Sequence, residues 1–455
     1  MKTRVVLVRH GQSTYNAQRR IQGHCDDSGL TELGQQQARK VGSALLGIPF
    51  QAVYASPLQR ASHTAELIVE VLRSQTPAIP NPTLDADLRE ISLPLWEGMS
   101  FKDAEAQYPA EFRAWRSQPE TLKMPVPDDS GAEADFYPVR SLFEQARRFW
   151  QFLLSKHQGQ TVLLVAHSAI NRALIGTALD LGPDRQNSLH QANCGISILN
   201  FTGDWGGPVQ LESMNITSHM GEPLPTMRSR HKGPRLLLVR HGETEWNRQK
   251  RFQGQIDIPL NENGIAQAEK AAEFLKSIRL DAAVTSPLLR PKATAEAILK
   301  HHPHLTLGLE DRLKEIGHGE WEGKLEAEIE TGYPGLLAQW QSAPETVQMP
   351  GEGGENLEQV WHRAIAGWQQ IVADHSNTSA PVTVMVSAHD AVNKAILCHV
   401  VGLGPDHFWC FKQGNGAVSV IDYPDGADSQ PVLSASNITT HLFDSIFDRT
   451  AAGAL

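Results

Sequence analysis

The 455-residue chain has little of three features that would settle its class at once. Its four cysteines form no C-x-x-C pair, so neither a disulfide framework nor a zinc site is expected, and the default prediction is a reducing, cytoplasmic location. The apolar run VVLV near the N-terminus is too short for a signal peptide or a membrane span. The formal net charge of -10 opposes sequence-independent binding of nucleic acid, which needs a clustered positive surface.

The composition is that of an ordinary globular protein, with 40% hydrophobic and 20% charged residues. At about 150 residues per domain, the length predicts two to four domains. If the substrate is an anion, a few local cationic groups must attract it against the overall negative field. The arginines are therefore the expected source of this attraction.

One unit is written twice along the chain. LVRHGQSTYN at residues 7–16 returns as LVRHGETEWN at 238–247, so that His241 follows His10 by 231 positions. The spacing then shortens slowly, as small loop deletions would cause, until His389 follows His167 by 222 positions. The remaining landmarks keep the same order: SPLQR and SPLLR, LREI and LKEI, two WEG triplets, NITS and NITT. This regularity indicates a tandem duplication.

The predicted domains are residues 1–220 and 234–455, joined by a linker at 221–233 that is rich in proline and basic residues and has no apolar period. Within each unit, short apolar strand patterns alternate with helical patterns. Alternation of this kind predicts an α/β fold, with two tandem three-layer α/β/α domains that each hold a mostly parallel sheet between helices.

The polar motifs follow the predicted strands. RVVLV leads into Arg-His-Gly, AVYAS into SPLQR, and TVLLVAH ends in a histidine. Ser56 is expected to cap the next helix, with Pro57 in its first turn. Because ligands bind outside the carboxyl ends of parallel strands, these motifs are expected to meet in one pocket.

Two histidines, two arginines and one glutamate recur in this frame, and together they suit phosphoryl transfer. Histidine beside arginine and glycine fits a nucleophile that attacks phosphorus, since the arginine fork holds phosphate oxygens and glycine allows a close backbone approach. A second arginine and histidine would stabilise charge in the transition state. A carboxylic acid would protonate the leaving oxygen. No metal or other cofactor is needed. The candidates are His10, His167, Arg9, Arg60 and Glu90, with His241, His389, Arg240, Arg290 and Glu315 in the second unit.

Each residue alone has an ordinary explanation, such as a polar strand end or a solvated helix residue. Their conjunction, in order and twice, resembles the histidine phosphatase superfamily, which includes cofactor-dependent phosphoglycerate mutase. The resemblance implies that His10 and His241 become phosphorylated and that Glu90 and Glu315 donate protons. It also implies the following phosphate-binding residues: Arg9, Gly11, Asn16, Arg60 and His167, with Arg240, Gly242, Asn247, Arg290 and His389.

The two units depart from the family pattern in different ways. Ser168 and Asp390 stand where the family often has glycine after the second histidine, and Asp390 would repel phosphate unless it points away or hydrogen-bonds the substrate. The first unit has Gln12 where the second has Glu243, which is commoner in the family. It also has EADFYPVR at 133–140 where the second has GGEN at 353–356. The two pockets are therefore expected to differ in substrate preference.

The first unit also resembles a narrower group. Its stretches YPVRSLFEQARRFW, VAHSAINRALIGTALDLG and QANCGISILNF are similar to the plant 2-carboxy-D-arabinitol-1-phosphatases. The resemblance implies a phosphorylated sugar acid as a candidate substrate, with Arg140 as an anchor for its carboxylate. Capping or solvation of the helix near Ser141 is an equal alternative for Arg140.

The leading hypothesis is a metal-independent phosphatase of small phosphorylated metabolites, with no nucleic acid or membrane partner and with homo-oligomers left open. The first alternative is a mutase that returns the phosphoryl group to bound substrate. Mutases usually have a longer insertion between the glutamate and the second histidine, whereas here Glu90 and His167 are 77 positions apart, and Glu315 and His389 are 74 apart. The second alternative is that one unit has become a binding or dimerisation module.

Overall fold

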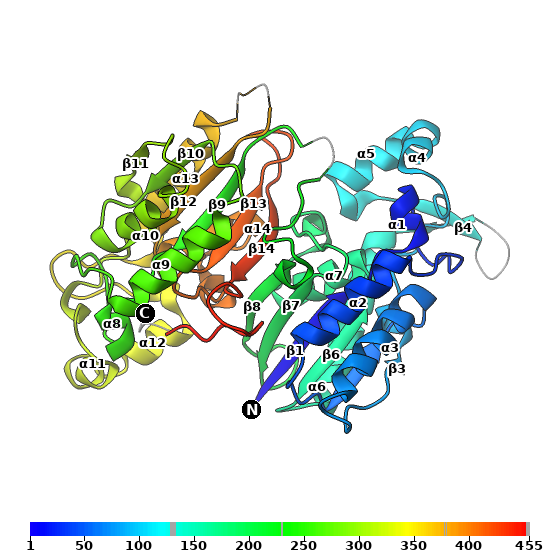
Figure 1. Cartoon of the computed structure of the whole chain (residues 1–455), viewed down its shortest axis with the longest axis horizontal. Helices are drawn as coiled ribbons and strands as arrows, with labels where there is room; N and C mark the ends of the chain where they lie inside the picture. Colours follow the sequence, from blue (N-terminus) through cyan, green and yellow to red (C-terminus); the bar gives the residue numbers. More distant parts are fainter. Residues whose placement is uncertain (128–132, 229–230, 377, 379, 452–455) are drawn as a thin grey trace. The chain divides into compact units, whose positions relative to one another are not determined.

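The structure is a computed structural model that describes residues 1–127, 133–228, 231–376, 378 and 380–451. The chain divides into two compact units, Met1–Pro225 and Thr226–Leu455. Figure 1 shows both units, with helices and strands coloured along the sequence. The predicted linker falls around this division, and its residues 229 and 230 lie outside the described residues.

The first unit contains eight strands among its described residues. They are β1 (Lys2–Arg9), β2 (Ala52–Ala55), β3 (Thr83–Leu84), β4 (Met124–Pro127), β5 (Glu133–Phe136), β6 (Thr161–Ala166), β7 (Ile196–Thr202) and β8 (Val209–Ile216). Its α-helices are α1 (Thr14–Gln18), α2 (Glu32–Ala44), α3 (Gln59–Arg73), α4 (Phe101–Gln107), α5 (Pro109–Ser117), α6 (Pro138–Lys156) and α7 (Ser168–Ala178). The main sheet has the order β8-β7-β1-β6-β2-β3, and β4 pairs with β5 in a separate ribbon.

The second unit repeats the main sheet of the first. Its strands are β9 (Arg235–Arg240), β10 (Ala282–Thr285), β11 (Leu307–Leu309), β12 (Thr383–Ala388), β13 (Val418–Asp422) and β14 (Val432–Ile438). Its α-helices are α8 (Glu245–Gln249), α9 (Glu262–Leu275), α10 (Leu289–Leu299), α11 (Glu326–Gly332), α12 (Leu336–Ser342), α13 (Leu357–Asp374) and α14 (Asp390–Val401). The sheet order is β11-β10-β12-β9-β13-β14, which is the order of the equivalent strands in the first unit, β3-β2-β6-β1-β7-β8.

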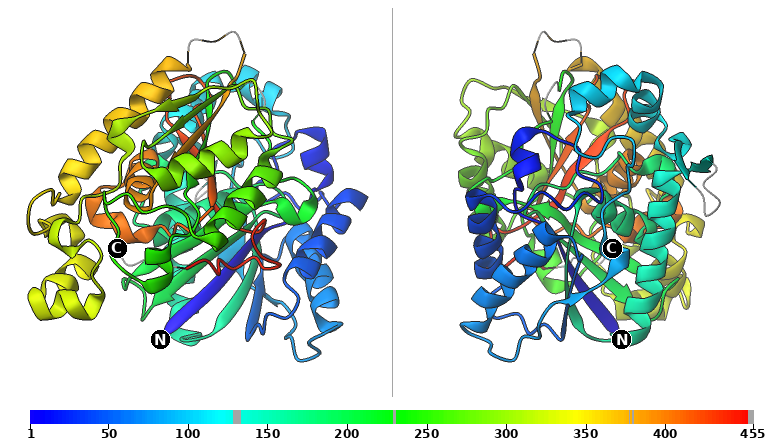
Figure 2. Two further views of the ribbon diagram at one scale, coloured as in Figure 1. Left: turned by 60° about the vertical axis from the view of Figure 1, so that its left-hand side comes forward. Right: turned by 90° about the vertical axis from the view of Figure 1, so that its right-hand side faces the viewer.

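Both sheets are mostly parallel, as predicted, with an antiparallel pair of strands on one side. In the first unit, β1, β6, β2 and β3 run parallel, whereas β7 is antiparallel to β1 and β8 is antiparallel to β7. Helices α2 and α3 cover one face of this sheet and α6 and α7 the other (Figure 2). The central strands are apolar throughout because both faces are covered: Val5–Val8 of β1 are buried.

Strand register places the motif histidines next to one another. Arg9 pairs with Ala166 across β1 and β6, so His10 and His167 are the next residues along two neighbouring parallel strands. In the second unit, Arg240 pairs with Ala388 in the same register. The histidine pair therefore lies at the carboxyl end of the sheet in each unit.

One predicted helix start was wrong. Helix α3 begins at Gln59, and its N-cap is Leu58, which makes no side-chain cap hydrogen bond. The Ser56 hydroxyl is used instead by His167, whose Nε2 lies 2.8 Å from Ser56 Oγ. A partner 111 residues away thus takes the role that local helix signals assigned to a cap.

Within the described residues, no helix is long and apolar enough to cross a membrane. All four cysteines are free thiols.

Candidate active site

The histidine pair is buried at the carboxyl end of the first sheet. The rings of His10 and His167 lie 5.1 Å apart between centroids, in an edge-on arrangement. His10 Nδ1 lies 2.7 Å from the carbonyl oxygen of Gly11. A carbonyl only accepts hydrogen bonds, so Nδ1 carries the proton and Nε2 keeps its lone pair. His10 is therefore held as a neutral imidazole with a nucleophilic nitrogen.

Burial and nearby cations keep both histidines neutral. Desolvation, followed by the charges of Arg9 and Arg60, lowers the pKa of His10 well below its ordinary value. The pKa of His167 is lowered in the same way, mainly by desolvation and by Arg60. An unprotonated His10 is what attack on phosphorus requires.

Arg60 enters the site from the start of α3 and is fully buried. Its Nη2 donates to the Gly23 carbonyl at 2.9 Å and its Nη1 to the Cys25 carbonyl at 3.1 Å. Two carbonyl acceptors fix the plane of the guanidinium, which is the condition for directional binding of an oxyanion.

Several buried donors around His10 have no hydrogen-bond partner in the part of the chain that the structure describes. They are Arg9 Nε, Arg60 Nε and His167 Nδ1. Desolvation lowers the pKa of Arg9 to about 10, so it stays charged at neutral pH. Buried donors normally find partners, and this group therefore marks a site for an anion with several acceptor oxygens.

Glu90 reaches the same place from the loop after η1 (Ala86–Leu88). Its Oε1 accepts hydrogen bonds from the backbone N–H groups of Ala169 at 3.0 Å and Ile170 at 3.1 Å, in the first turn of α7. Because α7 begins directly after His167, the helix N-terminus fixes the carboxyl group beside that histidine.

The second unit repeats this geometry with one added contact. His241 and His389 have ring centroids 5.2 Å apart, and His241 Nδ1 lies 2.7 Å from the Gly242 carbonyl. Arg290 Nε donates to His241 Nε2 at 3.2 Å, which places the lone pair of that nitrogen toward the guanidinium. Arg240 Nε and His389 Nδ1 are again buried donors without a partner among the described residues.

Glu315 is buried, and its pKa is raised by desolvation and by the charge of Asp390. Its Oε1 accepts from the Ile316 N–H at 3.0 Å and its Oε2 from the Ala391 N–H at 3.3 Å. A raised pKa favours the protonated carboxyl, which can give its proton to a leaving oxygen near neutral pH.

Two asparagines that the sequence reasoning missed connect the nucleophile loop to the sheet. Asn193 Nδ2 donates to the His10 carbonyl at 2.9 Å and to Asn16 Oδ1 at 3.1 Å. Asn415 makes the same two contacts with His241 and Asn247. Their signal in the sequence is a repeated Gln-x-Asn, at 191–193 and 413–415, with the spacing of 222 seen at the second histidine.

The repeated Asn-Ile-Thr landmark supports that loop. Asn215 has a left-handed backbone, with φ of 56°, and its Oδ1 accepts from the Ala192 N–H at 2.8 Å. Asn437 has φ of 52° and accepts from the Gly414 N–H at 2.7 Å. Asparagine tolerates a left-handed backbone better than most residues, and its side-chain oxygen can accept the loop N–H, so it suits both positions.

Gly11 has a packing reason to be glycine. A Cβ at this position would lie 2.3 Å from the carbonyl oxygen of Gly34, at the start of α2. Gly242 stands against Gly264 in the same way. The close backbone approach expected from the sequence is therefore to a neighbouring helix start, and phosphate binding by these glycines stays a prediction.

Arg140 is exposed in the first turn of α6, and its Nε donates to the Glu120 carbonyl at 2.8 Å. Its guanidinium lies over the Tyr137 ring, 4.7 Å from the centroid. Its exposure fits a solvated helix residue, whereas α6 has no side-chain cap, and a role in binding a substrate carboxylate stays a prediction.

Asp390 is buried and paired with cations. Its Oδ2 lies 2.9 Å from Lys394 Nζ, and its Oδ1 lies 3.7 Å from Arg240 Nη1. The repulsion between Asp390 and phosphate that the sequence predicted is therefore offset by two neighbouring positive charges of the second unit.

Comparison with known proteins agrees with this geometry. A family model described as the histidine phosphatase superfamily (branch 1) matches residues 5–216 and 236–437. The 2-carboxy-D-arabinitol-1-phosphatase of Triticum aestivum is 33% identical over 449 residues, which cover 96% of this chain and 86% of that protein. A probable 2-carboxy-D-arabinitol-1-phosphatase of Arabidopsis thaliana is 30% identical, over 96% of this chain and 88% of its own. Phosphoserine phosphatase 1 of Hydrogenobacter thermophilus is 36% identical over 208 residues, 46% of this chain and 94% of that enzyme.

Proposed function

The chain belongs to the histidine phosphatase superfamily and is a phosphoric monoester hydrolase, and we propose that both of its units hydrolyse phosphomonoesters of small metabolites through a phosphohistidine. The observation that carries this proposal is the set of unpartnered buried donors around a neutral, oriented histidine in each unit. The proposal includes a cytoplasmic location, which the free thiols support.

In the proposed reaction, Nε2 of His10 or His241 attacks phosphorus and the bond to the leaving oxygen breaks. Glu90 or Glu315 gives its proton to that oxygen. The resulting carboxylate takes a proton from water, whose oxygen attacks the phosphohistidine and releases inorganic phosphate and a neutral histidine. No metal takes part in these steps.

The proposal assigns phosphate binding to the residues that surround the nucleophile. The arginine forks would hold the oxygens in plane, and His167 or His389 would donate through Nδ1. Ser56 Oγ lies 2.8 Å from His167 Nε2, and Ser286 Oγ lies 2.9 Å from His389 Nε2. A hydroxyl that donates to that nitrogen would leave the proton of the histidine on Nδ1. The assigned residues are Arg9, Gly11, Asn16, Arg60 and His167, with Arg240, Gly242, Asn247, Arg290 and His389.

The candidate substrate is 2-carboxy-D-arabinitol 1-phosphate or a related sugar-acid phosphate. The support is similarity along nearly the whole chain to two plant proteins that carry the name of that phosphatase. Similarity of about half the chain to a phosphoserine phosphatase makes a small phosphorylated acid the wider class.

Phosphate on histidine is the direct test of the mechanism. Acid-labile, alkali-stable label from a radioactive phosphomonoester is expected on both His10 and His241 after rapid quenching. His10→Ala and His241→Ala should each remove one labelled site, and the double variant should carry no label and show no turnover. Label on the double variant would refute the nucleophile assignment. Label confined to one histidine would make the other unit the binding or dimerisation module.

Added 2,3-bisphosphoglycerate separates hydrolysis from the mutase alternative. Turnover of a phosphomonoester to free phosphate is expected to be unchanged by it, because water is the acceptor and no priming is needed. A strict requirement for this compound, with no net release of phosphate, would establish a mutase instead.

A further inference from the structure

The two units surround equivalent pockets with different charges. Asp390 directly follows the second histidine of its unit, where the first unit has the neutral Ser168. Glu243 lies two positions after the nucleophile, where the first unit has Gln12. Both replacements add a carboxylate to the second unit.

The Asp390 carboxylate is placed to act on a ligand. The residue is 5% exposed, and its Oδ1 is a buried oxygen with no hydrogen-bond partner in the described chain. Its Oδ2 accepts a hydrogen bond from Lys394, so the side chain is fixed beside Arg240 at the N-terminus of α14. Its charge raises the pKa of Glu315, which indicates that its field reaches the reacting groups.

Glu243 is also buried, and its side chain is hydrogen-bonded by two amides. Its Oε1 accepts from Asn261 Nδ2 at 2.9 Å and its Oε2 from Asn263 Nδ2 at 3.0 Å. Two amide donors satisfy the carboxylate without neutralising it. Gln12 of the first unit accepts from the Thr31 hydroxyl at 3.0 Å and brings no charge.

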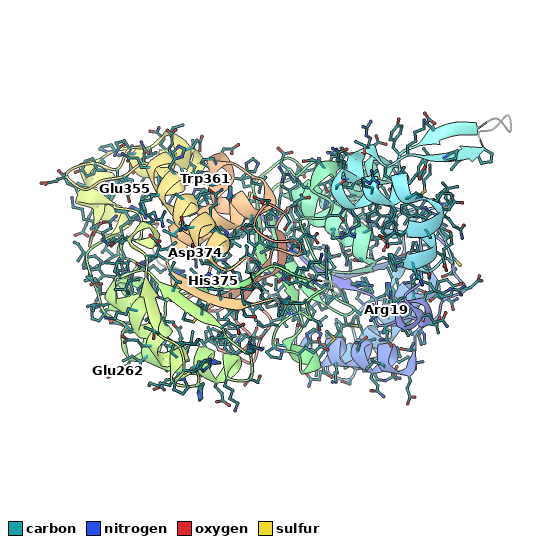
Figure 3. All side chains as sticks on the ribbon, turned by 90° about the horizontal axis from the view of Figure 1, so that it is seen from above. Arg19, Glu262, Glu355, Trp361, Asp374 and His375 are labelled. Carbon is teal, nitrogen blue, oxygen red and sulfur yellow. The ribbon has the colours of Figure 1, made fainter. Side chains whose placement is uncertain are left out.

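Three other features near the reacting groups add no net charge to the second unit. Glu355 of the second unit, just ahead of α13 (Figure 3), forms a two-bond ion pair with Arg363 at 2.7 Å and 2.7 Å, so the pair has no net charge. Gln255 donates to the Glu315 carbonyl where His24 of the first unit contacts the Glu90 carbonyl. The basic residue four positions after Asp390 or Ser168 is retained, as Lys394 or Arg172. The second unit therefore has two carboxylates that the first lacks, and of these Asp390 lies beside the reacting groups, since its charge raises the pKa of Glu315. The first unit has one exposed carboxylate that the second lacks, Asp27, where Ile258 stands in the second.

We infer that this difference divides the substrates between the units by the charge of the leaving group. The first pocket takes phosphomonoesters whose leaving group carries a second anion, such as a carboxylate. The second takes phosphomonoesters with a neutral or cationic leaving group, whose hydroxyl or ammonium donates to Asp390 Oδ1. The inference rests on the proposed function, since it requires a hydrolytic pocket in each unit.

A matched pair of substrates tests it. 3-Phosphoglycerate and glycerol 3-phosphate differ in a carboxylate against a hydroxymethyl group. The His241→Ala protein, with only the first pocket active, is expected to favour 3-phosphoglycerate in kcat/KM by about tenfold more than the His10→Ala protein does. This is the scale for unit charges several ångströms away in a partly screened site. The ratio should shrink as salt is added.

Exchange of the charge within each pocket is the sharper experiment. Asp390→Asn in the His10→Ala background should move the ratio toward 3-phosphoglycerate by about tenfold. Ser168→Asp in the His241→Ala background should move it away by a similar factor, and this half-buried position carries less risk of misfolding than the buried Asp390. Glu269→Gln on the exposed side of α9 is the matched control, because it removes one negative charge of the same unit and should leave the ratio unchanged.

The outcomes separate the inference from the proposed function. Absence of turnover in both single-histidine variants would refute the proposed pair of hydrolytic pockets. If either variant turns over, and Asp390→Asn or Ser168→Asp leaves its ratio of kcat/KM for the two substrates unchanged, the charge inference alone is overturned. Calorimetric binding of the same two compounds to the double histidine variant, with and without each exchange, gives a second readout that needs no turnover.

Discussion

Arg60→Ala is expected to lower kcat of the first pocket about 10³-fold or more, measured in the His241→Ala background so that the second pocket does not contribute. The guanidinium is buried, planar and fixed by the Gly23 and Cys25 carbonyls. It is therefore oriented before the substrate arrives. An oriented arginine that stabilises the phosphoryl transition state contributes about 10³- to 10⁵-fold in comparable reactions.

Two further variants show whether the effect is catalytic. Arg60→Lys keeps the charge without the planar fork and should recover only part of the loss, since a point charge cannot bind both carbonyls and phosphate in one plane. Arg290→Ala in the His10→Ala background should behave like Arg60→Ala. Thermal unfolding of each variant separates loss of fold from loss of chemistry, because removing Arg60 leaves two buried carbonyls without their donor. A folded Arg60→Ala protein with kcat within tenfold of its parent would show that this arginine does not bind the transferring group.

The fold was predictable because strand patterns depend on local sequence, and the duplication shows the same patterns twice. Strands β1 and β6 are continuous apolar runs, and a run of that kind is typical of a strand covered on both faces. The two strands pair in parallel with Arg9 opposite Ala166, and this register brings His10 and His167 together from distant parts of the chain. The antiparallel direction of β7 and β8 was not predicted, since strand direction depends on how the chain crosses the sheet.

The parts of the site that escaped prediction depend on long-range partners. Ser56 has the local signature of a helix cap, and only the folded chain shows that His167 uses its hydroxyl. Asn193 acts on the His10 carbonyl across 183 positions. The repeated Gln-x-Asn was visible in the sequence, but its spacing alone does not say what the amide touches. The roles of these residues in turnover stay predictions.

Below about pH 6.5 the free energy of unfolding is expected to fall steeply as the pH is lowered. Burial and neighbouring cations hold the pKa of four histidines well below the ordinary value, namely His10, His167, His241 and His389. Between the lowered folded pKa and the unfolded pKa near 6.5, the unfolded chain binds protons that the folded chain does not. The stability that these groups contribute is therefore present above about pH 6.5 and is lost as the pH falls toward their folded pKa values.

Each such histidine contributes a slope of up to about 1.4 kcal/mol per pH unit, so these four alone give up to about 5 kcal/mol per pH unit, shared between the two units. Three further histidines add to the slope, because burial lowers the pKa of His219 to about 4, of His318 to about 3 and of His441 to about 4. Glu315 opposes this trend, because a raised folded pKa makes the folded state bind more protons as the pH falls toward the ordinary carboxyl value. One group among several cannot reverse the sign. Urea unfolding between pH 7.5 and pH 5 measures the slope for each unit.

His318 provides the matched variant for this slope. It is buried between Phe252 and Trp340, neither ring nitrogen has a hydrogen-bond partner among the described residues, and desolvation lowers its pKa to about 3. The first unit has Leu93 in the matching place in the repeat, also buried, so His318→Leu should fit the space. This variant should reduce the slope by about 1.4 kcal/mol per pH unit in the second unit and leave the first unchanged. Stability that stays level from pH 7.5 to pH 5 would mean that the histidines bind protons in the folded state, and His10 and His241 would then not be held neutral for attack on phosphorus.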